Sequence, residues 1–335
     1  MRAHRDTLIA VAASVLLLTA GCGQAGSSGG AVDASTSTAS AVATCDPVPG
    51  NRLVVLDDNK GLQAVDNIVP AINTAAIAGD ATIVSLLDAV SATLDTTTLI
   101  GLNKAVDVDR QTSTQVAGQY LQSSGLGAQD MVGNGKKIIV GAGNFSESAT
   151  LAELYAGVLR SAGYDATTQT IGNRETYAPA LESGQLTIVP EYAGTLTEFL
   201  NKAANGADAA ALASSDLDAT MKALTNLGKA AGLTFGTPAA AQDQNAFAVT
   251  TAFANKHGVK TLSDLAKKCG GLVLGGPPEC PQRPFCQPGL EKTYGLQIGN
   301  FTSLDAGGPL TKAALQQGKI TVGLVFSSDA ALAAG

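Results

Sequence analysis

Along the middle of the chain, short continuous apolar runs alternate with apolar residues at helical spacing. The runs predict strands, and the helical spacing predicts helices. A β-branched run over 137–140 predicts a buried strand, and apolar residues recur at helical spacing over 151–159. Two more strands are predicted over 167–171 and 186–189, with a helix at 178–181 between them. Strands and helices that alternate in this way are typical of a parallel sheet covered by helices, so we expect an α/β fold.

The pattern continues on both sides of this region. The front of the chain predicts a strand over 53–56, followed by helices over 83–93, 98–102 and 116–121. The later part predicts a helical stretch over 207–232, a helix beginning at 261 and a strand over 272–274. The pattern A-L-x-x-G occurs at 180–184 and again at 314–318, which suits two domains of similar build.

The start of the chain has the composition of an export signal. Basic residues precede an apolar run over 8–18 that is too short to span a bilayer. Leu-Thr-Ala-Gly-Cys over 18–22 resembles a bacterial lipoprotein processing box, which implies a signal peptide at 1–21 and lipidation of Cys22. An ordinary secretory peptide is the alternative. Residues 22–44 are rich in Gly, Ser, Ala and Thr, so we expect a flexible tether that anchors the chain to a membrane.

Charge and rare residues exclude several function classes. The net charge of −7 argues against nucleic acid as a partner and against a polybasic membrane patch. After the signal only His257 remains, which disfavours a zinc site and a His-based hydrolase. No G-x-G-x-x-G or Walker pattern opens a helix, so there is no nucleotide-binding signature. We expect neither a cofactor nor a metal. Four further cysteines in an exported chain favour two disulfides with three possible pairings: Cys45, Cys269, Cys280 and Cys286.

Two segments resemble one known family. Residues 136–200 (KKIIVGAGNFSESATLAEL to VPEYAGTLTEFL) look like the beginning of the glycine betaine/choline-type substrate-binding proteins of ABC importers. Residues 52–108 (RLVVLDDNKGLQ to TLIGLNKAVDV) look like the end of such a protein. Because that order is reversed here, the resemblance implies a circularly permuted chain. It also implies a two-domain, type II periplasmic-binding-protein-like fold in which each domain is a mostly parallel sheet flanked by helices.

The permuted order implies domain boundaries. The family's C-terminal segment (51–124) would be joined through a linker (125–135) to its N-terminal segment (136–238). Domain 1 would then span 45–238 and domain 2 would span 239–335, with hinge segments at 239–250 and 325–335.

The resemblance also bears on the disulfides. The family's domains are connected by two strands, of which the permutation would cut the one that leads from 325–335 into residue 51. We therefore expect a Cys45–Cys269 disulfide to replace that connection, and a Cys280–Cys286 disulfide to close a small loop.

In open α/β sheets ligands collect at the carboxyl ends of the strands. The resemblance places the ligand there and implies aromatic faces that hold a quaternary ammonium group by cation–π attraction. Tyr192 begins a Y-x-G-T motif, whereas Phe247 stands where the family has Tyr and Ser148 where choline-type relatives carry Gln, so the ligand is left open. The expected ligand-binding residues are Phe145, Ser146, Ser148, Tyr177, Tyr192, Thr195, Asp243, Gln244, Asn245, Phe247, Glu279 and Asp329.

Several of these residues also have ordinary structural explanations. Tyr177 suits a core position as well as the cleft, and Asp329 suits a turn as well as a cation partner. Arg283 could bind a ligand carboxylate or fix the Cys280–Cys286 loop.

The expected protein is an extracytoplasmic, monomeric, non-enzymatic lipoprotein on the outer face of the cell membrane. It would pass a small quaternary-amine or zwitterionic osmolyte (glycine betaine, choline or carnitine type) to the permease of an ABC importer. A ligand-sensing or surface lipoprotein of the same fold is the alternative. A secreted hydrolase is disfavoured because G-x-S-x-G is absent and His257 lies in a polar turn.

Overall fold

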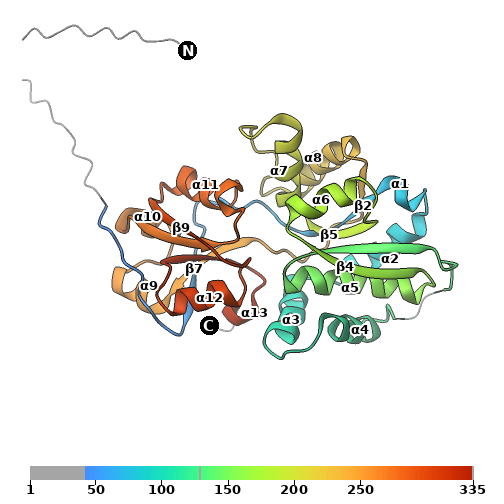
Figure 1. Ribbon diagram of the computed structural model, residues 1–335, viewed down its shortest axis with the longest axis horizontal. Coiled ribbons are helices and arrows are strands. Elements are labelled where there is room, and N and C mark those ends of the chain that lie inside the picture. The colour runs from blue at the N-terminus through green and yellow to red at the C-terminus, as the bar shows by residue number, and fades with distance from the viewer. Residues whose placement is uncertain (1–41, 128–129, 334–335) are drawn as a thin grey trace, which may run out of the picture. The chain divides into compact units, whose positions relative to one another are not determined.

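The computed structural model describes residues 42–127 and 130–333, which form two α/β lobes (Figure 1). Each lobe is built on a five-stranded sheet. Lobe A comprises residues 66–243, and lobe B comprises residues 42–62 together with 245–333. The expected signal peptide, Cys22 and most of the tether lie outside the described residues.

The sheet of lobe A has the strand order β4-β3-β5-β2-β6. β3 runs parallel to β4 and β5, whereas β2 runs antiparallel to β5 and β6. The strands are β2 (Ile68–Asn73), β3 (Lys137–Gly143), β4 (Asp165–Gly172), β5 (Ile188–Tyr192) and β6 (Leu233–Phe235). The helices are α1 (Thr74–Ile77), α2 (Ala81–Ser91), α3 (Thr96–Asp107), α4 (Ser113–Ser123), α5 (Ser146–Ser161), α6 (Arg174–Glu182), α7 (Ala193–Asn205) and α8 (Leu217–Ala230).

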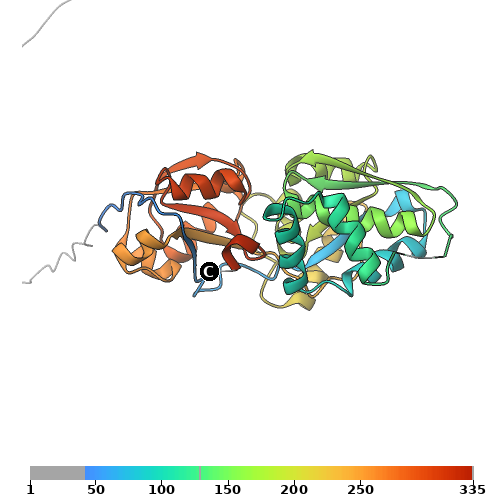
Figure 2. The ribbon, with the colours of Figure 1, turned by 90° about the horizontal axis from the view of Figure 1, so that it is seen from below.

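Alternating side chains divide the core of lobe A into two layers. Ile68 and Ile188 face α2 to α5, whereas Val69 and Val189 face α6 to α8. Figure 1 shows these two sets of helices on opposite sides of the sheet, and Figure 2 shows α3, α4 and α5 from below. The period of two along each strand produces this division, because successive side chains point to opposite faces.

The sheet of lobe B has the order β1-β7-β10-β8-β9. β7 is antiparallel to β1 and β10, whereas β8 is parallel to β10 and β9. The strands are β1 (Leu53–Leu56), β7 (Asn245–Thr250), β8 (Leu272–Gly276), β9 (Ile298–Ser303) and β10 (Val322–Phe326). The helices are α9 (Thr251–His257), α10 (Leu262–Lys268), the 3₁₀ helix η1 (Cys280–Gln282), α11 (Gln287–Gly289), the π-helix η2 (Leu290–Tyr294), α12 (Pro309–Gln316) and α13 (Ala330–Ala333).

The α/β class and the two sheets flanked by helices confirm the expected fold class. Both sheets are mixed, however, and not mostly parallel, because each has two antiparallel pairings. The helical stretch expected over 207–232 is also shorter: α8 begins at Leu217, where the Asp216 side chain accepts a hydrogen bond from the Ala219 amide and caps the helix.

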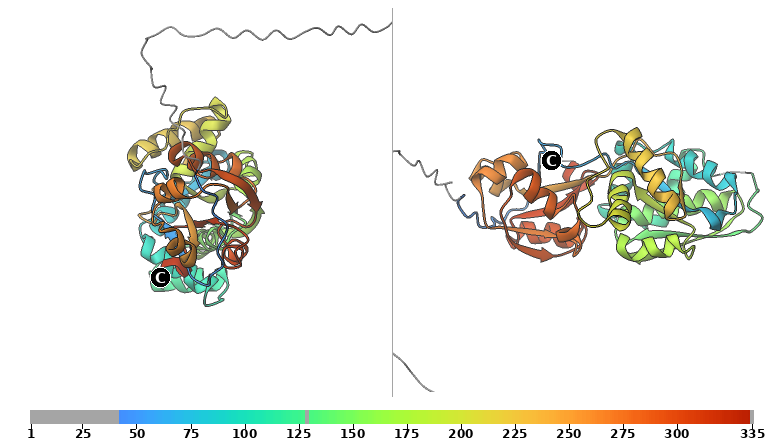
Figure 3. Two further views of the ribbon diagram at one scale, coloured as in Figure 1. Left: turned by 90° about the vertical axis from the view of Figure 1, so that its left-hand side faces the viewer. Right: turned by 90° about the horizontal axis from the view of Figure 1, so that it is seen from above.

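The expected boundary between the domains is wrong at the front of the chain. β1 pairs with β7 from Leu53↔Thr250 to Leu56↔Phe247, so this strand belongs to lobe B and not to the first domain. Two covalent segments therefore connect the lobes, 63–67 and 242–244, and they meet at a bridge between Asn67 and Gln242. Figure 3 shows the blue leading segment running along lobe B.

Both disulfides join the cysteine pairs that the sequence analysis favours. Cys45–Cys269 has a Cα–Cα distance of 5.1 Å, and Cys280–Cys286 has one of 5.2 Å. The expected role of the first disulfide is wrong, because Cys45 and Cys269 both lie in the core of lobe B. Together with the pairing of Thr44 and Gly270, this disulfide fastens the leading segment to lobe B and does not tie the two lobes together.

No single helix within residues 42–127 and 130–333 is long and apolar enough to cross a membrane. Only α2 and α3 taken together, with an 88° bend between them, have the necessary length and composition.

Candidate functional site

A cavity of about 420 Å³ lies between the two lobes, beside the segments that connect them. Lobe A contributes the start of α6, the turn from β5 into α7, and one side of α7. Lobe B contributes residues 282–285 and Phe326 at the end of β10. Asp66 and Asp243 reach the cavity from the connecting segments. The cavity is therefore enclosed only when the two lobes come together.

Aromatic rings from both lobes line this cavity: Tyr192 and Phe199 from lobe A, and Phe285 and Phe326 from lobe B. Phe145 lies behind them, with its ring centroid 6.2 Å from that of Tyr192 and 5.7 Å from that of Phe326. These separations are typical of favourable ring contacts. The rings form an apolar wall that could receive an alkylated cation.

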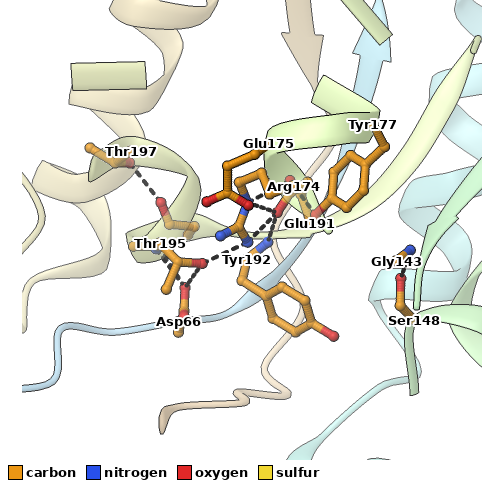
Figure 4. A network of polar contacts seen from close by, with 12 residues as sticks. Asp66, Gly143, Ser148, Arg174, Glu175, Tyr177, Glu191, Tyr192, Thr195 and Thr197 are labelled. Atoms are coloured by element: carbon orange, nitrogen blue, oxygen red, sulfur yellow. Dashed lines mark hydrogen bonds and ion pairs between the residues drawn. The ribbon is translucent and has the colours of Figure 1, made fainter. Parts of the chain in front are cut away.

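A buried ion pair supports the wall from lobe A (Figure 4). Arg174 donates from Nε and Nη2 to the two carboxylate oxygens of Glu191 at 2.9 and 2.7 Å, and also from Nη2 to Thr195 Oγ1 at 2.9 Å. The Tyr177 hydroxyl donates to Glu191 Oε1 at 2.9 Å. Burial alone would lower the pKa of Arg174, but the Glu191 carboxylate raises it above its ordinary value. The guanidinium thus stays charged, with Nε and Nη2 engaged by Glu191 and Thr195.

Asp66 occupies the edge of the cavity and is 5 % exposed. Its Oδ1 accepts hydrogen bonds from the amides of Gly194 and Thr195 at 2.9 and 3.0 Å, at the start of α7. Residue 194 is glycine for a steric reason, since a Cβ there would lie 2.4 Å from the carbonyl oxygen of Val65. Burial raises the pKa of Asp66 to about 7, although the Thr195 amide and the charge of Arg174 oppose that shift.

A second buried network crosses from lobe A to lobe B. Glu147 accepts hydrogen bonds from the hydroxyls of Tyr192 and Ser328, both at 2.6 Å, and from Asn103 Nδ2 at 2.6 Å. Asp243 Oδ1 accepts from the Ser328 amide at 3.2 Å. Burial raises the pKa of both carboxyl groups, and the charge of Glu147 raises that of Asp243 further. Ser328 of lobe B is therefore held by two acids on the other side of the cleft.

Polar contacts also close the rim of the cavity. Arg283 of lobe B forms an ion pair with Glu175 of lobe A at 2.9 Å, and a second with Glu279 at 3.2 Å. Lys202 Nζ donates to the Gln282 carbonyl at 3.0 Å. Because these groups are partly exposed, the contacts are weak enough to break when the lobes separate.

Four of the expected ligand-binding residues line the cavity: Tyr192, Thr195, Asp243 and Asn245. Phe145 contacts two of the lining rings from behind. The structure thus brings together the residues that follow β5 and those of the second connecting segment.

Three expected residues do not line this cavity and have structural roles elsewhere. Phe247 is 1 % exposed and packs in the core of lobe B. Alternate residues of β7 face opposite sides of the sheet, and Phe247 lies on the same side as Val249. Ser148 accepts a hydrogen bond from the Gly143 amide at 2.8 Å and fixes the turn from β3 into α5. Tyr177 packs in the core of lobe A and holds Glu191.

The four other expected residues do not line this cavity. Ser146 begins α5, where its carbonyl accepts from Thr150. Gln244 donates to the Ala64 carbonyl, and Glu279 pairs with Arg283. Asp329 forms an ion pair with Lys312 and lines a separate cavity of about 220 Å³.

Sequence reasoning missed Asp66, Arg174, Phe199, Phe285 and Phe326 as lining residues. Asp66 gave a usable signal, because it lies two residues before a strand whose residues are all buried. The phenylalanines gave none, since an isolated Phe is most often a core residue.

One group of possible metal ligands lies close together among the described residues: Cys45, His257 and Cys269. The disulfide uses both sulfur atoms, so neither is available as a thiolate ligand.

A family model described as the substrate-binding domain of ABC-type glycine betaine transport systems matches residues 36–123 and 136–334. Among curated proteins, the chain is 28 % identical over 179 residues to a glycine-betaine-binding protein of Pseudomonas aeruginosa PAO1, covering 50 % of this chain and 55 % of that protein. It is 29 % identical over 198 residues to the glycine betaine-binding protein YehZ of Escherichia coli K12, covering 56 % of this chain and 63 % of that protein.

The aligned part spans less than two thirds of the length of either relative. Among solved structures, the chain is similar to the crystal structure of a glycine betaine/carnitine/choline ABC transporter. The identity is 23 %, the match covers 59 % of this chain and 71 % of that one, and the TM-score is 0.38.

Proposed function

Because the chain belongs to the family of substrate-binding domains of ABC-type glycine betaine transport systems, we propose that it binds a small quaternary-amine osmolyte between its lobes. It would deliver this osmolyte to the permease of an ABC importer at the outer face of the cell membrane. The candidates are glycine betaine, choline and carnitine. The observation that carries the proposal is the interlobe cavity, which is lined by four rings from both lobes.

The chemistry of the cavity suits an alkylated cation. A quaternary ammonium group cannot donate hydrogen bonds, so it is held by the negative faces of aromatic rings, each worth roughly 0.5–2 kcal/mol. Tyr192, Phe199, Phe285 and Phe326 offer such faces, and Glu147 fixes the Tyr192 hydroxyl. With the ligand bound, the rings of lobe A and lobe B would share one guest, which stabilises the closed form over the open form.

Delivery to a permease further requires export and retention at the membrane. The processing box at 18–22 supports lipidation of Cys22. The Ala43 carbonyl accepts from the Gly270 amide, so the described chain is held in lobe B from this residue onward. A ligand sensor of the same fold would share these features, and uptake of labelled osmolyte by cells with and without the gene separates the two.

The ring-lined cavity is tested by a matched pair of variants. Phe199→Ala removes a half-buried ring from the cavity, whereas Phe301→Ala removes a half-buried ring from β9, away from it. Calorimetric titration with glycine betaine, choline, carnitine and proline betaine should give heat with at least one ligand. Phe199→Ala should weaken that binding about 5- to 30-fold, which corresponds to about 1–2 kcal/mol, while Phe301→Ala leaves it unchanged. If none of the four ligands binds the wild-type protein, the proposed ligand class is wrong.

The permuted order also remains a proposal. The family match omits 124–135, the stretch expected to join the family's two ends. In the family order β10 would be followed by β1 as the next strand along the chain, and both strands flank β7 in the sheet. Both features support a permutation whose opening lies within lobe B.

A further inference from the structure

Glu147 links the ring-lined cavity to lobe B through its two carboxylate oxygens. Its Oε1 accepts a hydrogen bond from the hydroxyl of Tyr192, whose ring lines the cavity. Its Oε2 accepts a hydrogen bond from the hydroxyl of Ser328 in lobe B, and both distances are 2.6 Å. One carboxyl group thus holds a ring of the ligand site and a residue of the opposite lobe at the same time.

The backbone of Ser328 is held on the lobe A side as well. Its carbonyl accepts a hydrogen bond from Asn103 Nδ2 of α3 at 3.2 Å, and its amide donates to Asp243 Oδ1 of the second connecting segment at 3.2 Å. Ser328 is only 2 % exposed, whereas the ion pairs at the rim of the cavity are partly exposed. Hydrogen bonds that are shielded from water cost more to lose, so this contact between the lobes is more specific than those at the rim.

The end of β10 also reaches Tyr192 by a second route. Phe326, the last residue of β10, lines the cavity, and its ring centroid lies 5.7 Å from that of Phe145. The ring of Phe145 in turn lies 6.2 Å from that of Tyr192. The same short segment of lobe B therefore supports the Tyr192 ring through aromatic contacts and through the Glu147 carboxylate.

Separation of the lobes would break the polar route. Ser328 follows β10 by two residues, and β10 pairs with β7 as far as Phe326↔Asn245, so Ser328 moves with lobe B. Glu147 and Tyr192 both belong to lobe A. Without Ser328, Glu147 has lost a donor and meets water, which competes with the Tyr192 hydroxyl for the carboxylate oxygens. The Tyr192 ring is then held less firmly.

Resting on the proposed function, we infer that Ser328 is a positioning residue for the ligand site, which couples contact between the lobes to the placement of the Tyr192 ring through Glu147. Ser328 does not itself line the cavity of about 420 Å³, so it acts on a ligand there only through other residues. Coupling of this kind is reciprocal: a ligand that fixes the Tyr192 ring also strengthens the contact between the lobes. Ser328 thus slows the release of the ligand, which requires the lobes to separate.

Ser328→Ala tests this role in the full chain, because it removes a donor to Glu147 without changing the lining of the cavity. Calorimetric titrations with glycine betaine, choline, carnitine and proline betaine give the affinities, and stopped-flow tyrosine fluorescence gives the rates. Ser328→Ala should weaken the binding of the ligand that the wild type takes by about tenfold. The loss should lie in faster dissociation, with the association rate constant unchanged within about twofold.

Two further variants show that the hydroxyl matters. Ser328→Thr retains the hydroxyl donor and should recover most of the affinity. Ser303→Ala, which removes an exposed hydroxyl at the end of β9, is the control and should leave affinity and rates unchanged. If Ser328→Ala does not unfold cooperatively in urea, Ser328→Cys takes its place, because a thiol of similar size is a weaker donor.

A double-mutant cycle distinguishes positioning from a general loss of packing. Tyr192→Phe keeps the ring and removes the hydroxyl that donates to Glu147, so it should also weaken binding about tenfold. Adding Ser328→Ala to Tyr192→Phe should then cost at most about twofold more, because the connection through Glu147 is already broken. Two independent effects would instead multiply to about a hundredfold.

The possible results bear on different claims. If Ser328→Ala binds and releases the ligand as the wild type does, the inference is wrong while the proposed function stands. Multiplied effects in the cycle would mean that Ser328 acts independently of Tyr192, and the coupling would be wrong. If none of the four ligands binds the wild type, the proposed function fails, and the inference fails with it.

Discussion

Buried charges around the cavity differ in how the protein compensates them. Arg174 and Glu191 form a bidentate ion pair with exposed side-chain fractions of 7 % and 1 %. Thr195 accepts a further hydrogen bond from Arg174, and Tyr177 donates one to Glu191. Removing one partner of such a pair typically costs about 3–5 kcal/mol, because the other charge stays buried. Asp66 has no such partner, so its protonation state depends on pH in the physiological range.

The titration of Asp66 predicts how stability depends on pH. The groups that face it are Arg174, Glu191 and Asp243, and its folded-state pKa of about 7 lies above the ordinary value of 3.8. The native state therefore binds more protons than the unfolded state between these values, so the stability contributed by Asp66 is fully present below about pH 4 and is lost as the pH rises through 7. The free energy of unfolding in urea, measured from pH 4.5 to 8, should fall less steeply with pH in Asp66→Asn than in the wild type.

The variant should not remove the pH dependence completely. Glu147 and Asp243 also have raised pKa values and contribute with the same sign. Identical slopes in the wild type and in Asp66→Asn would show that Asp66 is already ionised in the folded protein at low pH.

At the scale of elements, the sequence predicted the regular parts well and the partners of isolated segments poorly. The strand at 137–140 and the helix at 151–159 were predictable, because period and capping are local properties. The strand at 53–56 was located correctly, but its partner strand was not. This partner, β7, lies almost 200 residues later, and a local sequence pattern does not indicate which distant strand will pair. Phe247 was misassigned for the same reason: its motif suggested the ligand, whereas the pairing of β7 turns its ring into the core.

The leading segment depends on the Cys45–Cys269 disulfide for its place in lobe B. Cys45→Ser combined with Cys269→Ser should lower the free energy of unfolding by about 2–5 kcal/mol, because the disulfide closes a loop with a sequence separation of 224. Hydrogen exchange at β1 should become faster, since this edge strand pairs only with β7. Ligand affinity should change little, because the disulfide lies within lobe B and does not connect the lobes.

The second disulfide provides the control for this experiment. Cys280–Cys286 closes a short loop next to residues 282–285, which line the cavity. Its removal should affect ligand binding more than the exchange of β1. If removing Cys45–Cys269 weakens binding strongly, that disulfide does regulate the opening of the lobes.

At the scale of the molecule, the proposed permutation would involve one site in each lobe. Two former chain ends would be joined in lobe A, and two new chain ends would lie in lobe B. Residues 124–135 join α4 to β3 in lobe A, and in lobe B α13, near the end of the described chain, contacts β1 near its start. Two covalent segments still connect the lobes. Under the proposed permutation the opening would fall inside lobe B and not at the crossing, so the lobes should close on a ligand as in an uncut chain.

This arrangement predicts that the chain can be recut without loss of function. A chain that begins at Lys136, joins residue 333 to Cys45 through a Gly/Ser linker of about 15 residues, and ends at Ser124 restores the family order of segments. Because α13 contacts β1, which begins eight residues after Cys45, a flexible linker of this length, with a mean span of roughly 20 Å, should bridge the ends. The recut protein should unfold cooperatively and bind its ligand within about threefold of the wild-type affinity. A control chain recut inside β5, between Val189 and Pro190, interrupts a fully buried strand of the lobe A sheet and should fold poorly. Failure of the first chain to fold would mean that residues 124–135 are an integral part of lobe A and not a joint between two former ends.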